Sequence, residues 1–216
     1  MKKEYPVFFR EGQVRRYGKG QILLYQGEKT NDIFLIKKGY VKVYDITKSG
    51  NEKLLMLLGE CDILPQIMTF GKNEPLLYFY ESHSDVELLA LKQSALIDEI
   101  NKNHETAKIY LRYYINQARI LMSRIECLEA SVTKVKIGLV LMYLVKAHGK
   151  KKLMAKSNIS TILPQITHQT IANMAGVTRE TASLQMKKLE KEKIIRNNKN
   201  KNLEVNCSKL KKLLNK

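Results

Sequence analysis

Short apolar runs separated by turn residues mark the chain up to about residue 92. The runs are Gln21–Tyr25, Ile33–Ile36, Tyr40–Tyr44, Lys53–Leu58, Leu76–Tyr80 and Asp85–Leu91. Turn candidates lie between them at Gln26–Glu28, Lys37–Gly39 and Ser49–Asn51. Strands at close spacing with glycine turns are typical of a sandwich or a barrel, so the pattern predicts a β-domain over residues 1–93.

The hydrophobic period changes after about Ser94. No proline or glycine occurs from there to Leu128, and apolar positions recur at alternating steps of three and four. After His104 they are Ala107, Leu111, Tyr114, Ala118, Leu121, Ile125 and Leu128. This heptad spacing predicts one helix of roughly 35 residues, about 50 Å long.

A small β-domain is too short to bury such an apolar seam along its whole length. Two copies of the helix side by side can bury it, so residues 94–130 are predicted to form a parallel homodimer. The alternative is a helix that packs only within its own chain.

Residues 131–216 are predicted to form a separate domain. Ser131–Thr133 is the expected joint, and the stretch Val135–Ala147 is expected to be an amphipathic helix with Gly149 as its C-cap residue. Lys150–Lys152 is expected to be a solvated loop.

The segment from Thr167 onward has the pattern of a helix-turn-helix. Thr167 is the expected N-cap of a helix over His168–Ala175, and Gly176 allows a tight left-handed turn. Thr178 is the expected N-cap of a second helix, Arg179–Lys191. The inward positions are Ile171, Ala172, Ala175, Ala182, Met186 and Leu189.

The outward face of the second helix carries the candidate base-reading residues, which are Arg179, Glu180, Ser183 and Leu184. The first residues of this helix reach base edges in the major groove when the motif docks. Arginine donates two hydrogen bonds to guanine, and glutamate accepts one from the amino group of cytosine. A favourable interaction with the helix dipole is the alternative role of Glu180.

Candidate phosphate contacts lie at both helix starts, along the second helix and in a later turn. They are Thr167, His168, Gln169, Thr178, Lys187, Lys188, Lys199 and Lys201. The two last lysines lie in an Asn-rich turn between Ile194–Arg196 and Leu203–Val205, which is predicted to form a hairpin wing. A merely solvated loop is the alternative.

Charge separates the two parts of the chain. Residues 1–130 hold 19 Lys/Arg and 17 Asp/Glu, a net charge of +2, whereas residues 131–216 hold 19 and 4, a net charge of +15. This asymmetry favours a polyanion-binding module joined to a near-neutral one. Charge alone does not distinguish DNA from RNA or an anionic membrane.

Several other classes of protein are disfavoured. The three cysteines, Cys61, Cys127 and Cys207, are far apart and in no metal-ligand spacing, so no disulfide scaffold and no metal site are expected. No stretch approaches the roughly 20 apolar residues of a membrane span. With no signal-peptide pattern, a cytoplasmic location is expected. No nucleophile–base pair or phosphate-binding glycine loop indicates an enzyme.

The chain resembles the CRP/FNR family of transcription regulators, most specifically in Thr167–Ala172 and Gly176–Ser183. Weaker similarity lies at Gly27–Glu28, Ile36–Val43 and Leu58–Glu60. The resemblance implies an α+β fold with an N-terminal β jelly roll of the cyclic-nucleotide-binding type, a long dimerisation helix and a C-terminal winged helix-turn-helix. It also implies direct contact with RNA polymerase in activators. A two-fold pair of recognition helices predicts double-stranded DNA with a palindromic site as the target.

Two features depart from the family pattern. Relatives that bind cyclic AMP hold its phosphate with an arginine, but no arginine lies between Arg16 and Arg112, and lysine does not replace a bidentate guanidinium. Cyclic AMP is therefore not expected, no cofactor is assigned, and the effector is unidentified. Leu184 occupies a position where many relatives have arginine; leucine contacts a thymine methyl but cannot bond to guanine.

Candidates for an apolar effector pocket are Ile63, Leu64, Tyr78 and Tyr80, with plain core packing as the alternative. The leading hypothesis is thus a dimeric, sequence-specific transcription regulator. The alternative is an effector-binding signalling module whose basic tail binds polyanions without specificity.

Overall fold

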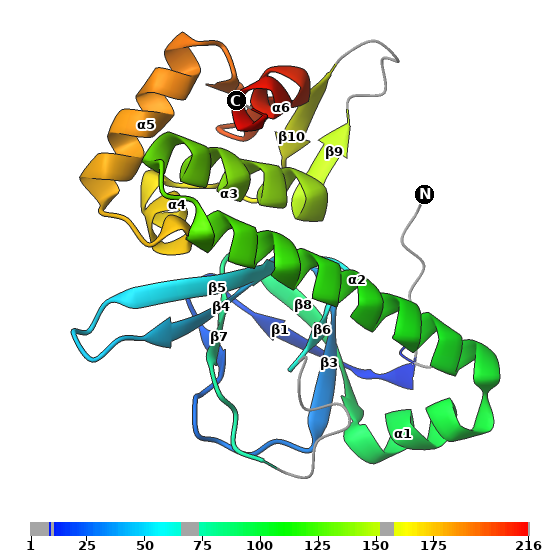
Figure 1. Cartoon of the computed structure of the whole chain (residues 1–216). Helices are drawn as coiled ribbons and strands as arrows, with labels where there is room; N and C mark the ends of the chain where they lie inside the picture. The colour runs from blue at the N-terminus through cyan, green and yellow to red at the C-terminus, as the bar shows by residue number, and fades with distance from the viewer. Residues whose placement is uncertain (1–8, 10, 66–73, 152–157, 216) are drawn as a thin grey trace. The chain divides into compact units, whose positions relative to one another are not determined.

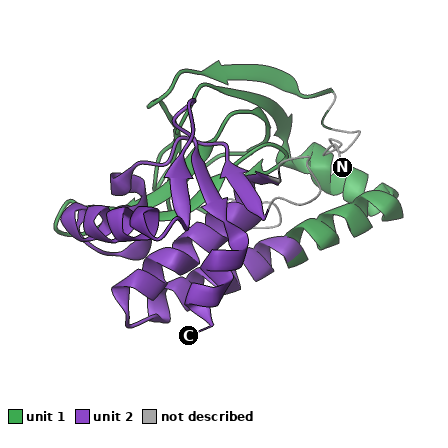
Figure 2. Ribbon diagram, turned by 90° about the horizontal axis from the view of Figure 1, so that it is seen from above, with its two compact units in different colours: residues 1–115 green, residues 116–216 purple. Residues whose placement is uncertain are grey.

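The computed structural model describes residues 9, 11–65, 74–151 and 158–215 (Figure 1). Two compact units comprise residues 1–115 and residues 116–216 (Figure 2). Their division falls inside the predicted dimerisation helix. The three-segment boundaries inferred from the sequence therefore stay a prediction.

Two antiparallel sheets form the first unit. In spatial order, one contains β1 (Gln13–Tyr17), β8 (Val86–Lys92), β3 (Asp32–Lys38) and β6 (Ile63–Leu64). The other contains β2 (Ile22–Leu24), β7 (Phe79–Ser82), β4 (Val41–Ile46) and β5 (Glu52–Leu58). Every pairing within them is antiparallel. This two-sheet arrangement is the predicted jelly roll.

A buried cluster joins the first sheet to the helices that follow it. Its members are Phe9, Ile33, Leu35, Ile63, Leu89, Leu96 and Tyr110. Leu96 lies on α1 (Gln93–Lys102) and Tyr110 on α2 (His104–Glu129), so both helices share the core of the first unit.

The strand prediction missed two strands and misplaced a third. β1 is an edge strand with mostly exposed side chains, and β6 has only two residues, so neither produces a clear apolar alternation. β7 begins at Phe79 rather than Leu76. The backbone of Leu76 instead bonds to the turn, with its N–H donating to Glu28 (2.8 Å) and its carbonyl accepting from Gly27 (2.8 Å).

The prediction of one uninterrupted helix was wrong at Asn103. This residue is extended, with φ −126° and ψ 102°, and it separates α1 from α2. Its side-chain Oδ1 accepts hydrogen bonds from the backbone N–H groups of Glu105 (3.1 Å) and Thr106 (3.3 Å). Asparagine is a favoured N-cap because it satisfies such unpaired N–H groups, so it starts a new helix here.

Helices and a small sheet make up the second unit. After α2 come α3 (Thr133–His148), α4 (His168–Ala175), α5 (Arg179–Lys191) and α6 (Cys207–Leu214). The sheet has the order β11 (Ile195–Asn197), β12 (Leu203–Asn206), β10 (Ile159–Ile162) and β9 (Gly149–Lys151).

Helix α3 is the central element of this unit. It begins at the predicted joint and buries Ile137, Val140, Leu141, Tyr143 and Leu144. Gly149 is its C-cap, as predicted. The expectation of a loop at Lys150 and Lys151 was wrong, because β9 pairs with β10 through Lys150–Thr161 and Lys151–Ser160. Lys152 lies outside the described residues.

Candidate nucleic-acid interface

The helix-turn-helix begins and ends where its capping residues predict. The Thr167 hydroxyl accepts a hydrogen bond from the N–H of Thr170 (3.0 Å), which starts α4. Gly176 ends α4 in the left-handed conformation, with φ 65° and ψ 40°. The Thr178 hydroxyl then accepts from the N–H of Thr181 (3.2 Å), which starts α5. Local hydrogen bonds and one glycine therefore fix the angle between the helices.

Small buried residues allow α4 and α5 to pack closely. Ala172 on α4 and Ala182 on α5 are both fully buried. The other predicted inward positions, Ile171, Ala175, Met186 and Leu189, are buried as well. Because these side chains form the core of the motif, the opposite face of α5 is left to solvent.

Three of the four candidate base-reading residues are exposed on that face. Arg179 and Glu180 occupy the first turn of α5, and Leu184 is 55% exposed one turn later. A cationic, an anionic and an apolar side chain thus stand at the end of α5 that enters the groove in this class of motif. Their contact with bases stays a prediction.

Ser183 is arranged differently. It is half-buried, and its Oγ lies 3.1 Å from Nδ1 of His168, the first residue of α4. The two residues were predicted as a base reader and a phosphate contact, but the structure brings them together. This hydrogen bond ties the start of α4 to the outward face of α5. No pattern in the sequence indicates it.

The remaining phosphate candidates along the helices differ in how their polar groups are used. Thr167 and Thr178 are exposed but serve as caps. Gln169 donates from its side-chain amide to Asn173 Oδ1 (2.6 Å) within α4. Lys187 and Lys188 are exposed on α5. All of these phosphate roles stay predictions.

The predicted wing is a hairpin formed by β11 and β12. Asn198 organises its turn, because its side-chain Oδ1 accepts from the N–H groups of Asn200 (2.9 Å) and Asn202 (3.0 Å). Lys201 has a left-handed backbone, with φ 58°. Lys199 and Lys201 are both exposed at this turn, which places two cations at its tip.

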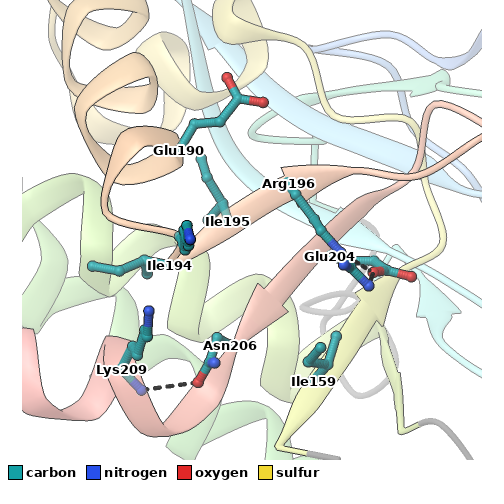
Figure 3. Close-up of a pocket in the computed structure, with 9 residues that line it drawn as sticks. Ile159, Glu190, Ile194, Ile195, Arg196, Glu204, Asn206 and Lys209 are labelled. Carbon is teal, nitrogen blue, oxygen red and sulfur yellow. Dashed lines mark hydrogen bonds and ion pairs between the residues drawn. The ribbon is translucent and has the colours of Figure 1, made fainter.

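At the base of the wing, Arg196 is held by an ion pair. Its guanidinium contacts the Glu204 carboxylate at 2.6 Å, and Glu204 is 4% exposed (Figure 3). This pair borders a hollow of about 370 Å³ between the end of α5, the sheet and α6. Because the buried carboxylate holds Arg196, we do not count it among the candidate phosphate contacts.

Comparison with known proteins identifies both parts of this architecture. The family profile of the cyclic nucleotide-binding domain matches residues 14–103, and that of the Crp-like helix-turn-helix domain matches residues 138–213. The chain belongs to the CRP/FNR family of transcription regulators. It is therefore a regulator with a DNA-binding helix-turn-helix domain, and its family is one of regulators rather than enzymes.

Individual relatives agree with this assignment. The HTH-type transcriptional regulator ArcR of Staphylococcus epidermidis is 28% identical over 191 residues, which is 87% of this chain and 80% of that protein. The Cyclic AMP receptor protein of Thermus thermophilus is 24% identical and covers 85% of this chain and 80% of its own length. Among solved structures, FixK2 from Bradyrhizobium japonicum shares the fold with a TM-score of 0.75 at 16% identity, over 94% of this chain and 96% of that one.

In this family member, the predicted seam lies on the exposed side of α2. Leu111, Leu121, Ile125 and Leu128 are 62%, 47%, 54% and 43% exposed. Ala118 is exposed as well, whereas Ala107 and Tyr114 are half-buried. Of the thirteen large apolar side chains that are exposed among the described residues, seven lie on α2.

The candidate effector residues lie in both sheets or beside them. Ile63 and Leu64 form β6 and are 2% and 0% exposed, and Tyr80 on β7 is 3% exposed. Tyr78, just before β7, is half-buried. Ile63 packs in the cluster with Phe9 and Leu35, so it contributes to the core. A role in effector binding stays a prediction.

Two further findings concern the described residues only. They contain no group of three or more His, Cys, Asp or Glu side chains placed to hold a metal ion. None of their helices combines the length and the apolar character that a membrane span requires.

The wing lysines provide a test of phosphate binding. We expect Lys199→Gln with Lys201→Asn to weaken binding to all duplexes alike, and to flatten the plot of log K against log salt by about 1 for each phosphate that is no longer neutralised. Asparagine tolerates the left-handed backbone of position 201, so the turn is retained. Fluorescence anisotropy at several salt concentrations measures the slope.

The matched control is Lys211→Gln, an exposed lysine on α6, outside the motif and the wing. It should leave the slope nearly unchanged. An unchanged slope in the double variant would mean that the wing is only a solvated loop.

Proposed function

We propose that this regulator binds DNA as a homodimer and places two α5 helices in successive major grooves of a palindromic site. In such docking the recognition helices lie about one DNA turn apart, roughly 34 Å. The observation that carries the proposal is the outward face of α5, where Arg179, Glu180 and Leu184 are exposed at the N-terminal end of a rigidly capped helix.

The chemistry of that face favours base reading over simple charge attraction. Arg179 presents a planar fork that suits guanine O6 and N7. Glu180 would be repelled by phosphates, but it can accept a hydrogen bond from a cytosine amino group. A pair of opposite charges adds no net attraction for a polyanion, so its value lies in specificity.

Leu184 is proposed to alter the half-site. Leu184 is a large apolar side chain that is 55% exposed on the outward face of α5. A thymine methyl provides an apolar contact in the major groove. The half-site is therefore proposed to contain a thymine where relatives with arginine at this position read guanine or contact phosphate.

Dimerisation is proposed through the seam of α2. The heptad positions from Leu111 to Leu128 form a stripe of apolar side chains that a second copy of the same helix can bury by knobs-into-holes packing. A two-fold axis along this seam relates the two α5 helices, and a palindrome is the DNA sequence with the same symmetry.

The first unit is proposed to be a sensor with an effector other than cyclic AMP. Its family profile is that of a cyclic nucleotide-binding domain, yet the chain has no arginine from residue 17 to residue 111. An effector can change DNA binding only by binding one arrangement of the dimer better than another. The proposal also includes RNA polymerase as a partner and a cytoplasmic location, and both rest on the family resemblance. Co-precipitation of the polymerase on promoter DNA tests whether RNA polymerase is a partner.

Alanine at Arg179 and Glu180 tests sequence reading. The double substitution removes one charge of each sign, so non-specific attraction to DNA is retained. We expect the preference for the selected palindrome over random duplex to fall by about 1–3 kcal/mol for each base that the variant no longer reads. Competition binding measures it, with the site first obtained by selection from random DNA.

The control is Glu105→Ala with Lys108→Ala, an exposed ion pair on α2 that is likewise neutral in sum. It should retain the palindrome preference. If alanine at Arg179 and Glu180 leaves the ratio unchanged as well, the alternative of a signalling module with a non-specific basic tail is favoured.

Calorimetric titration with cyclic AMP tests the missing arginine. We expect no heat of binding at micromolar concentrations, because the chain has no arginine from residue 17 to residue 111 to pair bidentately with the cyclic phosphate. A micromolar dissociation constant would refute this part of the proposal and show that another group holds the phosphate.

A further inference from the structure

Arg124 is a buried arginine of α2 that lies beside the seam. It is 6% exposed, whereas its neighbours Leu121, Ile125 and Leu128 are exposed. Burying a guanidinium is costly unless the surrounding groups compensate its charge. The part of α2 that carries it belongs to the second unit (Figure 2), so its contacts are with the DNA-binding half of the chain.

The first compensating group is the end of α4. Nη2 of Arg124 donates a hydrogen bond of 2.9 Å to the backbone carbonyl of Met174. Met174 lies in the last turn of α4, where carbonyl groups lack partners within the helix and carry partial negative charge. A buried cation here satisfies a carbonyl and interacts favourably with the helix dipole.

The second compensating group is an aromatic ring on α3. The guanidinium carbon lies 5.3 Å from the centre of the Tyr143 ring, within the range of a cation–π interaction. Tyr143 is itself 2% exposed. Arg124 therefore connects three helices, α2, α3 and α4, at one point.

Close by, the Cys127 thiol stays neutral. It donates to the Ser123 carbonyl at 3.1 Å, and burial raises its pKa while the Arg124 guanidinium acts in the opposite direction. The thiol lies close enough to the Arg124 guanidinium to interact with it. The carbonyl and the ring thus orient the guanidinium.

We propose that Arg124 is a positioning residue that fixes the recognition helix relative to the dimer seam. The carbonyl that it holds lies two residues before Gly176, whose left-handed turn sets the direction of α5. The same turns of α2 thus carry the seam and this anchor. The inference rests on the proposed dimeric function, and it adds a residue that determines the spacing between the two half-sites.

If Arg124 has this role, it controls how strongly the protein prefers one spacing between the two half-sites. The experiment measures affinity for the selected palindrome, for versions with one base pair inserted or deleted at the centre, and for a duplex with one half-site. Arg124→Met keeps much of the side-chain length and removes the donors and the charge. We expect the ratio of affinities for the preferred over the altered spacings to fall at least about fivefold, the low end of typical coupling between sites, with single half-site affinity unchanged.

Two further variants make the result decisive. Arg119→Met removes an exposed arginine from the same helix and should behave as the wild type. Arg124→Lys keeps the charge but not the planar group that stacks on Tyr143, so it should lower the ratio to a smaller extent. If thermal unfolding shows that the Arg124→Met variant is not folded, the affinity ratio of Arg124→Lys is compared with that of the wild type instead.

Three outcomes would count against the inference. A wild-type spacing ratio in both Arg124 variants would show that the residue does not position the motif. An equal loss of affinity for single and paired half-sites would show that Arg124 only stabilises the helix-turn-helix. A wild-type protein without any spacing preference would overturn the proposed dimeric function, and this inference with it.

Discussion

Within one chain, helix α2 buries only part of its apolar surface. Tyr110, Arg124 and Cys127 on this helix are buried, while Leu111, Leu121 and Ile125 are about half exposed. Apolar surface left in water costs about 25 cal/mol per Å², and seven of the thirteen exposed large apolar side chains among the described residues lie on this helix. In the proposed homodimer, the pairing that covers this stripe sets the symmetry of the attached DNA-binding motif.

The buried residues of α2 are equally important, because they connect this helix to the rest of each unit. Along the first unit, α2 buries Tyr110 in the core cluster of the jelly roll, and in the second unit it buries Arg124 against α3 and α4. One helix thus belongs to the core of both units. In the proposed homodimer, a change in how two copies pair along Leu121 and Ile125 acts on the same turns of α2 that contact α4 through Arg124.

Local chemistry was predictable from the sequence, and tertiary contacts were not. Thr167, Gly176 and Thr178 fixed the limits of α4 and α5 because caps and left-handed turns depend on neighbouring residues. The break at Asn103 carried the same kind of capping signal, but the absence of proline and glycine from Ser94 to Leu128 favoured one continuous helix. β1 and β9 are short edge strands without apolar alternation, so the period-two signal failed there. The contacts of Ser183 with His168 and of Arg124 with Met174 join residues 15 and 50 positions apart, which no local pattern encodes.

Sedimentation equilibrium of the wild type and of Leu121→Glu with Ile125→Glu tests the central claim most directly. The account predicts a wild-type particle of twice the chain mass of 25.0 kDa and a monomer for the double variant, because a buried unpaired carboxylate opposes the pairing. Ile46→Glu is the control, since Ile46 on β4 is 47% exposed, as is Leu121, but lies off the seam. A monomeric wild type, or a double variant that remains dimeric, would contradict the account.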